Sequence, residues 1–214
     1  TANMKGMVNE TSIAETDNGG VVMVARHWGA GNCRRIAWSR DGGETWGQVE
    51  DAPELFCDST QNSLMTYSLS DQPAYGGKSR ILFSGPSAGR RIKGQVAMSY
   101  DNGKTWQVSG PVQSGTGEGT LAEMSNGDIY YNSRSHMSID HRRRIAWSYD
   151  GGAMYVDWRV DDDLREVGQP FYFKYGTEPS YGCNAGLVRL PLECTGGKDV
   201  LVLARRMIPA ETVS

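Results

Sequence analysis

The sequence predicts an all-β fold built from repeated antiparallel sheets. Its 214 residues include 27 glycines and 8 prolines, which separate short apolar runs of strand length, and no stretch carries a long helical period. A Ser-x-Asp-x-Gly-x-x-Trp motif occupies residues 39–46 and recurs at 99–106, and a third copy begins at 148 without the tryptophan in its expected place. Two full copies and a remnant of one turn motif indicate repeated structural units.

Each copy of the motif follows a similar β-favouring run, so it marks a strand that enters a tight turn. These runs lie at 35–38, 95–98 and 144–147. In the turn, we expect the aspartate to accept hydrogen bonds from backbone N–H groups, the glycine to take positive φ, and the tryptophan to fold back as an apolar plug. The residues with this predicted structural role are Ser39, Asp41, Gly43, Trp46, Ser99, Asp101, Gly103 and Trp106.

A longer repeat contains these turns. Glu10 precedes Arg26 by 16 residues, and Glu118, which lies 108 residues after Glu10, precedes Arg134 by the same 16. We therefore expect one domain, 1–214, with an internal repeat of 9–117 and 118–214. At roughly 50 residues per blade, each unit would supply two four-stranded antiparallel blades of a β-propeller, about four in all. Most propellers close with more blades, so we expect the chain to be part of a longer domain.

The predicted strands follow the apolar runs in chain order, with glycine-containing turns between several of them. They lie at 21–25, 34–38, 63–68, 80–83, 95–98, 128–132, 144–147, 183–190 and 200–203.

Composition argues against several classes of protein. A net charge of −3 makes nucleic acid an unlikely partner. The four cysteines show no Cys-x-x-Cys spacing and only three histidines accompany them, so neither a metal site nor a cofactor is expected. The longest apolar runs are of strand length, far short of a membrane span. No signal peptide is present. Because the chain starts at Thr1, we expect it to be an internal piece of a longer protein, so the missing signal peptide does not indicate the compartment.

The motif and the spaced Glu and Arg residues resemble one enzyme family. Ser-x-Asp-x-Gly-x-x-Trp is similar to the Asp box, or BNR repeat, of sialidases (exo-α-neuraminidases). The run from Glu10 through Cys57 and Arg91 to Trp106 resembles the C-terminal half of bacterial sialidases, in the family's order. This resemblance implies a six-bladed β-propeller with its site at the hub. It also implies three arginines on the substrate carboxylate, a tyrosine nucleophile assisted by a glutamate, and an aspartate as acid/base.

The chemistry of sialic acid explains these residue types. The sugar carries a carboxylate on its anomeric carbon, and planar guanidinium groups bind carboxylates through paired, charge-assisted hydrogen bonds. A carboxylate nucleophile would be repelled by that group, and sialidases use a tyrosine instead. Because a phenol is weakly nucleophilic at neutral pH, a nearby glutamate must take its proton.

Two assignments of the site stay open. In the first, Glu10 is the base, Arg26 the second arginine and Arg91 the third; the tyrosine would then fall near residue 118, where the chain has Gly-Glu-Gly. In the second, Glu118 and Arg134 are the base and the second arginine, and the remaining groups would follow Ser214. The first arginine and the acid/base aspartate are identified in neither.

The resemblance implies a retaining hydrolase that removes terminal sialic acid, with a sialylated or other acidic glycan as partner. The alternative is an Asp-box propeller that binds an acidic sugar without cleaving it, or that has a structural role alone. A secreted or periplasmic location is implied by the resemblance only, and no oligomeric state is indicated. The arginine runs 34–35 and 142–144 are expected to coat strand edges.

Overall fold

The computed structural model describes residues 8–27, 32–57, 60–86, 93–109, 115–135, 142–166, 171–172, 179–180 and 184–204. Within these ranges the chain forms β-strands and three short 3₁₀ turns, and no α-helix is present. The all-β, antiparallel prediction is therefore confirmed. None of the described helices is long and apolar enough to cross a membrane. Arg91, a predicted site residue, and residue 183, the first of the predicted strand 183–190, lie outside the described residues.

Three four-stranded antiparallel sheets form the body of the molecule, and we call them blades 1 to 3. Blade 1 contains β1 (Val8–Glu15), β2 (Val21–His27), β3 (Cys33–Ser39) and β4 (Glu50–Phe56). Blade 2 contains β5 (Ser63–Ser68), β6 (Arg80–Pro86), β7 (Gly94–Ser99) and β8 (Gln107–Val108). Blade 3 contains β9 (Thr116–Glu123), β10 (Ile129–Ser135), β11 (Arg142–Ser148) and β12 (Val156–Arg165).

Two hairpins complete the described chain. β15 (Gly186–Arg189) pairs with β16 (Leu201–Ala204), and β13 (Phe171–Tyr172) pairs with β14 (Pro179–Ser180). The β15–β16 pair follows blade 3 in the chain and β15 lies beside β9. The three 3₁₀ turns are η1 (Asp17–Gly19), η2 (Pro73–Tyr75) and η3 (Leu192–Cys194).

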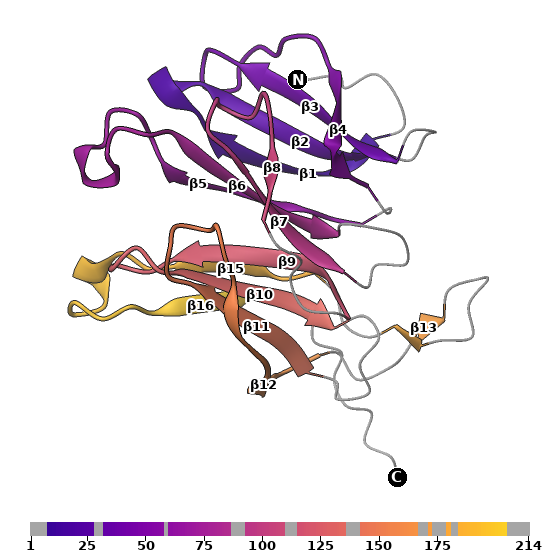
Figure 1. Cartoon of the computed structure of the whole chain (residues 1–214), viewed down its shortest axis with the longest axis vertical. Coiled ribbons are helices and arrows are strands. Elements are labelled where there is room, and N and C mark those ends of the chain that lie inside the picture. The colour runs from indigo at the N-terminus through magenta and orange to yellow at the C-terminus, as the bar shows by residue number, and fades with distance from the viewer. Residues whose placement is uncertain are drawn as a thin grey trace.

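The blades are stacked face to face, with the first strand of each blade on the inside (Figure 1). β1 lies beside β5, β5 beside β9, and β9 beside β15. Each sheet runs outward from its first strand in chain order, because strands that follow one another in the chain are hydrogen-bonded neighbours. The inner strands therefore share one central region, and this arrangement decides which side chains can meet there.

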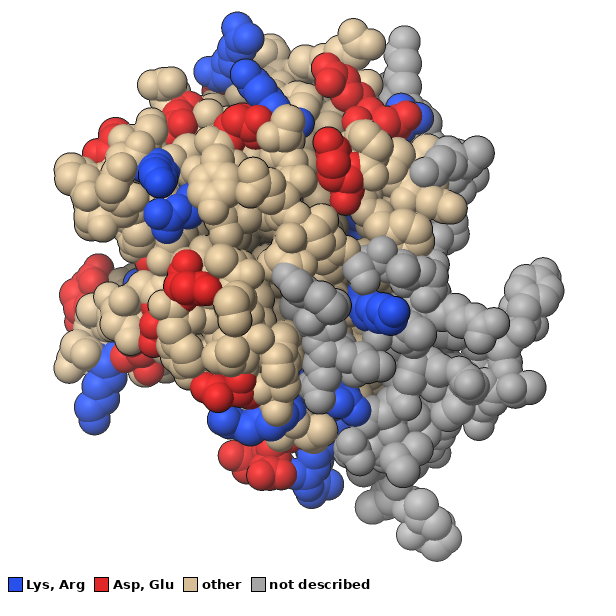
Figure 2. Space-filling model, viewed as in Figure 1, with Lys and Arg blue, Asp and Glu red and all other residues tan. Residues whose placement is uncertain are grey.

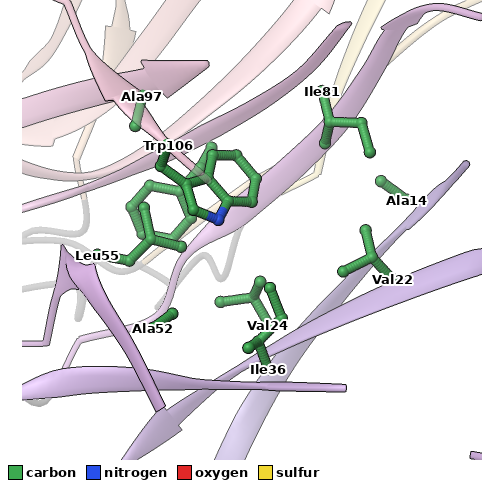
Figure 3. Close-up of a cluster of buried hydrophobic side chains, with 10 residues drawn as sticks. Ala14, Val22, Val24, Ile36, Ala52, Leu55, Ile81, Ala97 and Trp106 are labelled. Atoms are coloured by element: carbon green, nitrogen blue, oxygen red, sulfur yellow. The ribbon is translucent and has the colours of Figure 1, made fainter. Parts of the chain in front are cut away.

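Apolar side chains fill the space between successive blades. Between blades 1 and 2, Trp106 packs against residues from both sheets, such as Val24, Leu55 and Ile81 (Figure 3). A second cluster, which includes Leu82 and Tyr131, lies between blades 2 and 3. Blade 2 buries apolar side chains on both faces, because blade 1 packs against one face and blade 3 against the other. Its strand β6 is therefore buried at every residue after Arg80.

The three motif turns share one geometry. In the first, the Ser39 hydroxyl donates to Asp41 Oδ1 (2.7 Å) and accepts from the Gly43 N–H (2.8 Å). Asp41 Oδ1 also accepts from the Thr45 N–H at 2.9 Å, and Gly43 has φ +98°. The other two turns repeat these bonds with Ser99, Asp101, Gly103 and Thr105, and with Ser148, Asp150, Gly152 and Met154.

Candidate active site

A carboxylate on β1 and a guanidinium on β2 form an ion pair in blade 1. Asn9 pairs with Arg26 and Thr11 with Ala25, so Glu10 is the extra residue of a β-bulge, and its φ is +44°. Such a bulge re-aims a side chain. Glu10 Oε2 accepts a short hydrogen bond from Arg26 Nη1. The Glu10 side chain is 35% exposed and that of Arg26 is 10% exposed, so this ion pair is reachable from solvent at its carboxylate.

An equivalent pair stands in blade 3. Arg134 Nη1 donates to Glu118 Oε2 at 2.8 Å, between β10 and β9. The pairing register of these strands also shifts here, between Ser133 and Ser135. The two side chains are only 4% and 8% exposed, so this ion pair is buried. The structure thus joins each predicted glutamate to its predicted arginine, and the two pairs differ in accessibility.

One short segment lies between the strands that carry the two pairs. Residues 60–62 lead into β5, which lies between β1 and β9. The Gln61 N–H donates to Glu118 Oε1 at 3.3 Å, and the Asn62 carbonyl accepts from the Ser12 hydroxyl at 2.7 Å, two residues along β1 from Glu10. Both glutamates therefore lie at the beginning of an inner strand, on the same end of the stacked blades.

Two further arginines are fully buried, and sequence reasoning missed both. Arg34 and Arg143 were expected at strand edges, but each has 0% exposed surface, so this expectation is wrong for them. Their place near the start of β3 and of β11 turns the side chain inward, where backbone and side-chain acceptors replace water. Arg143 donates to Asn132 Oδ1 and, at 3.2 Å, to Glu166. One feature of the sequence could have pointed to these buried arginines: an arginine stands immediately before the Arg-Ile-Ala-Trp run in both repeat units.

The expected tyrosine nucleophile does not appear among the described residues around position 118. The Gly-Glu-Gly sequence lies within β9, and Gly119 leaves no room for a side chain: a Cβ there would lie 2.5 Å from the Tyr131 ring and 2.7 Å from Ser84 Oγ. Tyr131 itself has no exposed surface, and burial raises the pKa of its phenol. It therefore offers no reactive oxygen to a sugar.

The other end of the blades carries an open cleft of about 1060 Å³. It is lined by the first motif turn, by η1, and by Asn102 and Lys104 of the second motif turn, and it includes neither Glu–Arg pair. Acidic and basic side chains are interspersed over the face seen in Figure 2. Among the described residues, no group of three His, Cys, Asp or Glu side chains is placed to hold a metal ion.

Comparisons with known proteins relate both the sequence and the fold to other chains. No family model matches. A curated sialidase from Micromonospora viridifaciens is 30% identical over 166 residues, which is 76% of this chain. The chain spans only 25% of that relative's length.

Solved structures share the fold. The Trypanosoma rangeli sialidase in complex with sialic acid matches 94% of this chain and 34% of its own length, with a TM-score of 0.59 and 16% identity. The Hadza microbial sialidase Hz136 matches 92% and 39%, with a TM-score of 0.55 and 18% identity. The GH93 α-L-arabinofuranosidase of Fusarium graminearum matches 86% and 54%, with a TM-score of 0.59 and 16% identity.

Proposed function

We propose that this chain, a homologue of sialidases with their β-propeller fold, carries part of the active site of a glycoside hydrolase that removes terminal sialic acid. The observation that carries the proposal is the pairing of Glu10 with Arg26 and of Glu118 with Arg134 at the same end of the inner strands. A glutamate and an arginine brought together there are the residue types that an anomeric carboxylate and an assisted nucleophile require.

The Glu10–Arg26 pair is the better candidate for direct contact with the sugar. The Glu10 side chain is 35% exposed, whereas that of Glu118 is 8% exposed. Glu10 orients the Arg26 guanidinium, and an oriented guanidinium binds a planar carboxylate with less loss of side-chain freedom. In this assignment Glu10 assists the nucleophile and Arg26 binds the substrate carboxylate. Arg134 is a second cation at the same hub, and Arg91 stays a sequence-based prediction for the third.

A propeller that binds an acidic sugar without cleaving it is the second candidate. It is supported by Glu118, which stands where the resemblance places the tyrosine and is held in a buried ion pair with Arg134. A carboxylate at that place is a poor replacement for the tyrosine nucleophile, because its attack would be opposed by the anomeric carboxylate of sialic acid. The two candidates make the same prediction for binding and opposite predictions for hydrolysis.

The experiment uses the full-length protein, a fluorogenic sialoside and a 2,3-dehydrated sialic acid analogue, whose flattened ring mimics the transition state. Release of the fluorophore supports the hydrolase, and analogue binding without release supports the binding protein. Arg26→Lys keeps the charge but loses the paired geometry, so the analogue Kd should rise about tenfold or more. Arg35→Lys is the matched control, because Arg35 pairs with Asp51 on β4. Unchanged analogue binding in both Arg26→Ala and Arg134→Ala would refute the site.

A further inference from the structure

A fully buried guanidinium holds the segment that lies between the two Glu–Arg pairs. Arg34 Nη1 donates to the Thr60 carbonyl at 2.6 Å and to Asn62 Oδ1 at 3.2 Å, and Nη2 donates to Thr60 Oγ1 at 3.1 Å. Its Nε donates to the Phe56 carbonyl at 3.3 Å, at the end of β4. Thr60 and Asn62 are themselves 0% and 2% exposed. These bonds replace water for every acceptor involved, so Arg34 fixes the path of residues 60–62.

The same segment contacts Glu118 on one side and β1, the strand that carries Glu10, on the other. Its middle residue, Gln61, gives its N–H to Glu118 Oε1 in blade 3. Its last residue, Asn62, accepts from Ser12, which follows the Glu10 bulge in blade 1. One side chain from β3 therefore controls a backbone segment that contacts β1 on one side and β9 on the other. A change in the position of this segment would therefore act directly on Glu118, and through Ser12 on the strand that carries Glu10.

The charges around Arg34 also link it to both glutamates. Burial is the largest cause that lowers the pKa of Arg34 to about 10; the nearby Arg26 also lowers this pKa, whereas Cys57, Glu10 and Glu118 raise it. Arg34 therefore stays protonated at neutral pH, and both carboxylates lie within electrostatic reach of it. The guanidinium also lies over the Phe83 ring, 5.6 Å from its centre, which closes its remaining face.

We propose that Arg34 is a positioning residue that sets the relative placement of the Glu10–Arg26 and Glu118–Arg134 pairs through residues 60–62. It touches no substrate, because it has no exposed surface. Its effect on ligand binding rests on the proposed function, whereas its effect on the segment does not. Lysine cannot replace it, since one ammonium group cannot reach the four acceptors of a planar fork.

The first test follows the Gln61 amide by hydrogen exchange in the full-length protein without ligand. In Arg34→Lys, the segment loses its anchor and the Gln61 amide should exchange about tenfold faster or more. Leu82→Ala is the matched control: it destabilises the core between blades 2 and 3 but leaves every bond of residues 60–62 in place. Unchanged Gln61 exchange in folded Arg34→Lys would overturn the proposal, as would an equal increase in the control.

The second test measures the Kd for the dehydrated sialic acid analogue well below the melting temperature of each variant. Arg34→Lys should weaken binding about tenfold, while Leu82→Ala at similar stability should not. If Arg34→Lys fails to fold, Thr60→Val and Asn62→Ala each remove one acceptor and should raise Gln61 exchange by a smaller factor. If the wild-type protein does not bind the analogue, the proposed function is wrong and Gln61 exchange alone decides the role of Arg34.

Discussion

The ring of Tyr155 meets the ring of Tyr131 edge-on, with centroids 6.0 Å apart and an interplanar angle of 67°. In blade 2, Trp106 meets Phe83 at 6.1 Å and the same 67°. Tyr155 lies seven residues after Ser148, as Trp106 lies seven after Ser99. The third motif turn therefore keeps its aromatic plug, with tyrosine in place of tryptophan, and the plug packs against the preceding blade in both cases.

The ring of Tyr155 should stabilise the fold, and its hydroxyl should not. The side chain is 8% exposed, and its hydroxyl has no hydrogen-bond partner among the described residues. Tyr155→Ala should lower the free energy of unfolding by about 3–5 kcal/mol, through lost burial and a cavity. Tyr155→Phe removes an unsatisfied polar atom, so it should leave stability unchanged or raise it. Urea denaturation measures both; a large loss in the Phe variant would show that the hydroxyl has a partner.

The second motif turn should contribute stability and not ligand contact. Asp101 accepts from the Thr105 N–H at 2.9 Å and from the Lys104 N–H at 3.1 Å. Asp101→Ala should therefore lower the free energy of unfolding by about 1–3 kcal/mol. The analogue Kd of the folded variant should not change, because the turn lies at the other end of the blade from Glu10. A weaker Kd at an unchanged melting temperature would contradict the structural role.

These turns also predict how stability falls in acid. Burial raises the pKa of Asp101, but hydrogen bonds from Thr105, Ser99 and Lys104 outweigh it and leave the pKa lowered. The side chain and N–H of Thr45 lower the pKa of Asp41 to about 2. A carboxylate with a lowered folded pKa stabilises the protein above its unfolded value of about 3.9, and this stabilisation disappears as pH falls through the folded value.

The wild-type protein should therefore lose stability between about pH 4 and pH 2. Asp101→Asn should lose less over that range, because a protonated aspartate and an asparagine are both neutral. Urea denaturation at several pH values measures the difference. If the gap between wild type and variant stayed constant from pH 6 to about pH 2, the turn carboxylate would not be the titrating group.

The repeat made much of this architecture predictable. The 16-residue spacing of Glu10 and Arg26 fits two antiparallel strands joined by a tight turn, which returns the chain to its starting point. The motif turns were predictable because serine, aspartate and glycine each have one local role in them. The domain boundaries and the repeat units 9–117 and 118–214 stay predictions.

The bridge between the two ion pairs was not predictable from sequence. Arg34 looks like an edge residue, because a charged side chain is usually solvated, and its burial depends on acceptors 26 and 28 residues away. Gln61 contributes only its backbone N–H, so its side chain gives no signal. Contacts of this kind depend on how three blades stack, which local patterns do not encode.

Gly119 should be required by the close packing of β9 against Tyr131 of β10 and Ser84 of blade 2. A Cβ at this position would meet Tyr131 Cε2 at 2.5 Å and Tyr131 Oη at 2.6 Å. Gly119→Ala should therefore lower the free energy of unfolding by about 1–3 kcal/mol through overpacking. Gly186→Ala is the control, since the nearest atom to its Cβ would be Ala204 Cβ at 4.0 Å. Thermal unfolding compares the two; an equal small effect would mean that blade 3 moves to make room.

Substitution of the two glutamates should lower the free energy of unfolding by different amounts. Glu118→Gln leaves the Arg134 guanidinium, 4% exposed, without its carboxylate partner, and breaking a buried ion pair from one side costs about 3–5 kcal/mol. Glu10 is 35% exposed, so water can reach the place of its carboxylate beside Arg26, and Glu10→Gln should cost about 1 kcal/mol or less.

Urea denaturation of the two variants under the same conditions measures this difference, and Glu15→Gln, on the exposed end of β1, is the control for loss of charge alone. At temperatures where both variants are folded, Glu10→Gln should lose more sialoside hydrolysis or analogue binding than its small loss of stability explains, because Glu10 is the reachable carboxylate. The reverse order, with Glu10→Gln the less stable and Glu118→Gln the more impaired in function, would assign the substrate to the pair in blade 3. Glu118 would then have to reach the sugar through an opening of the contact between residue 61 and β9.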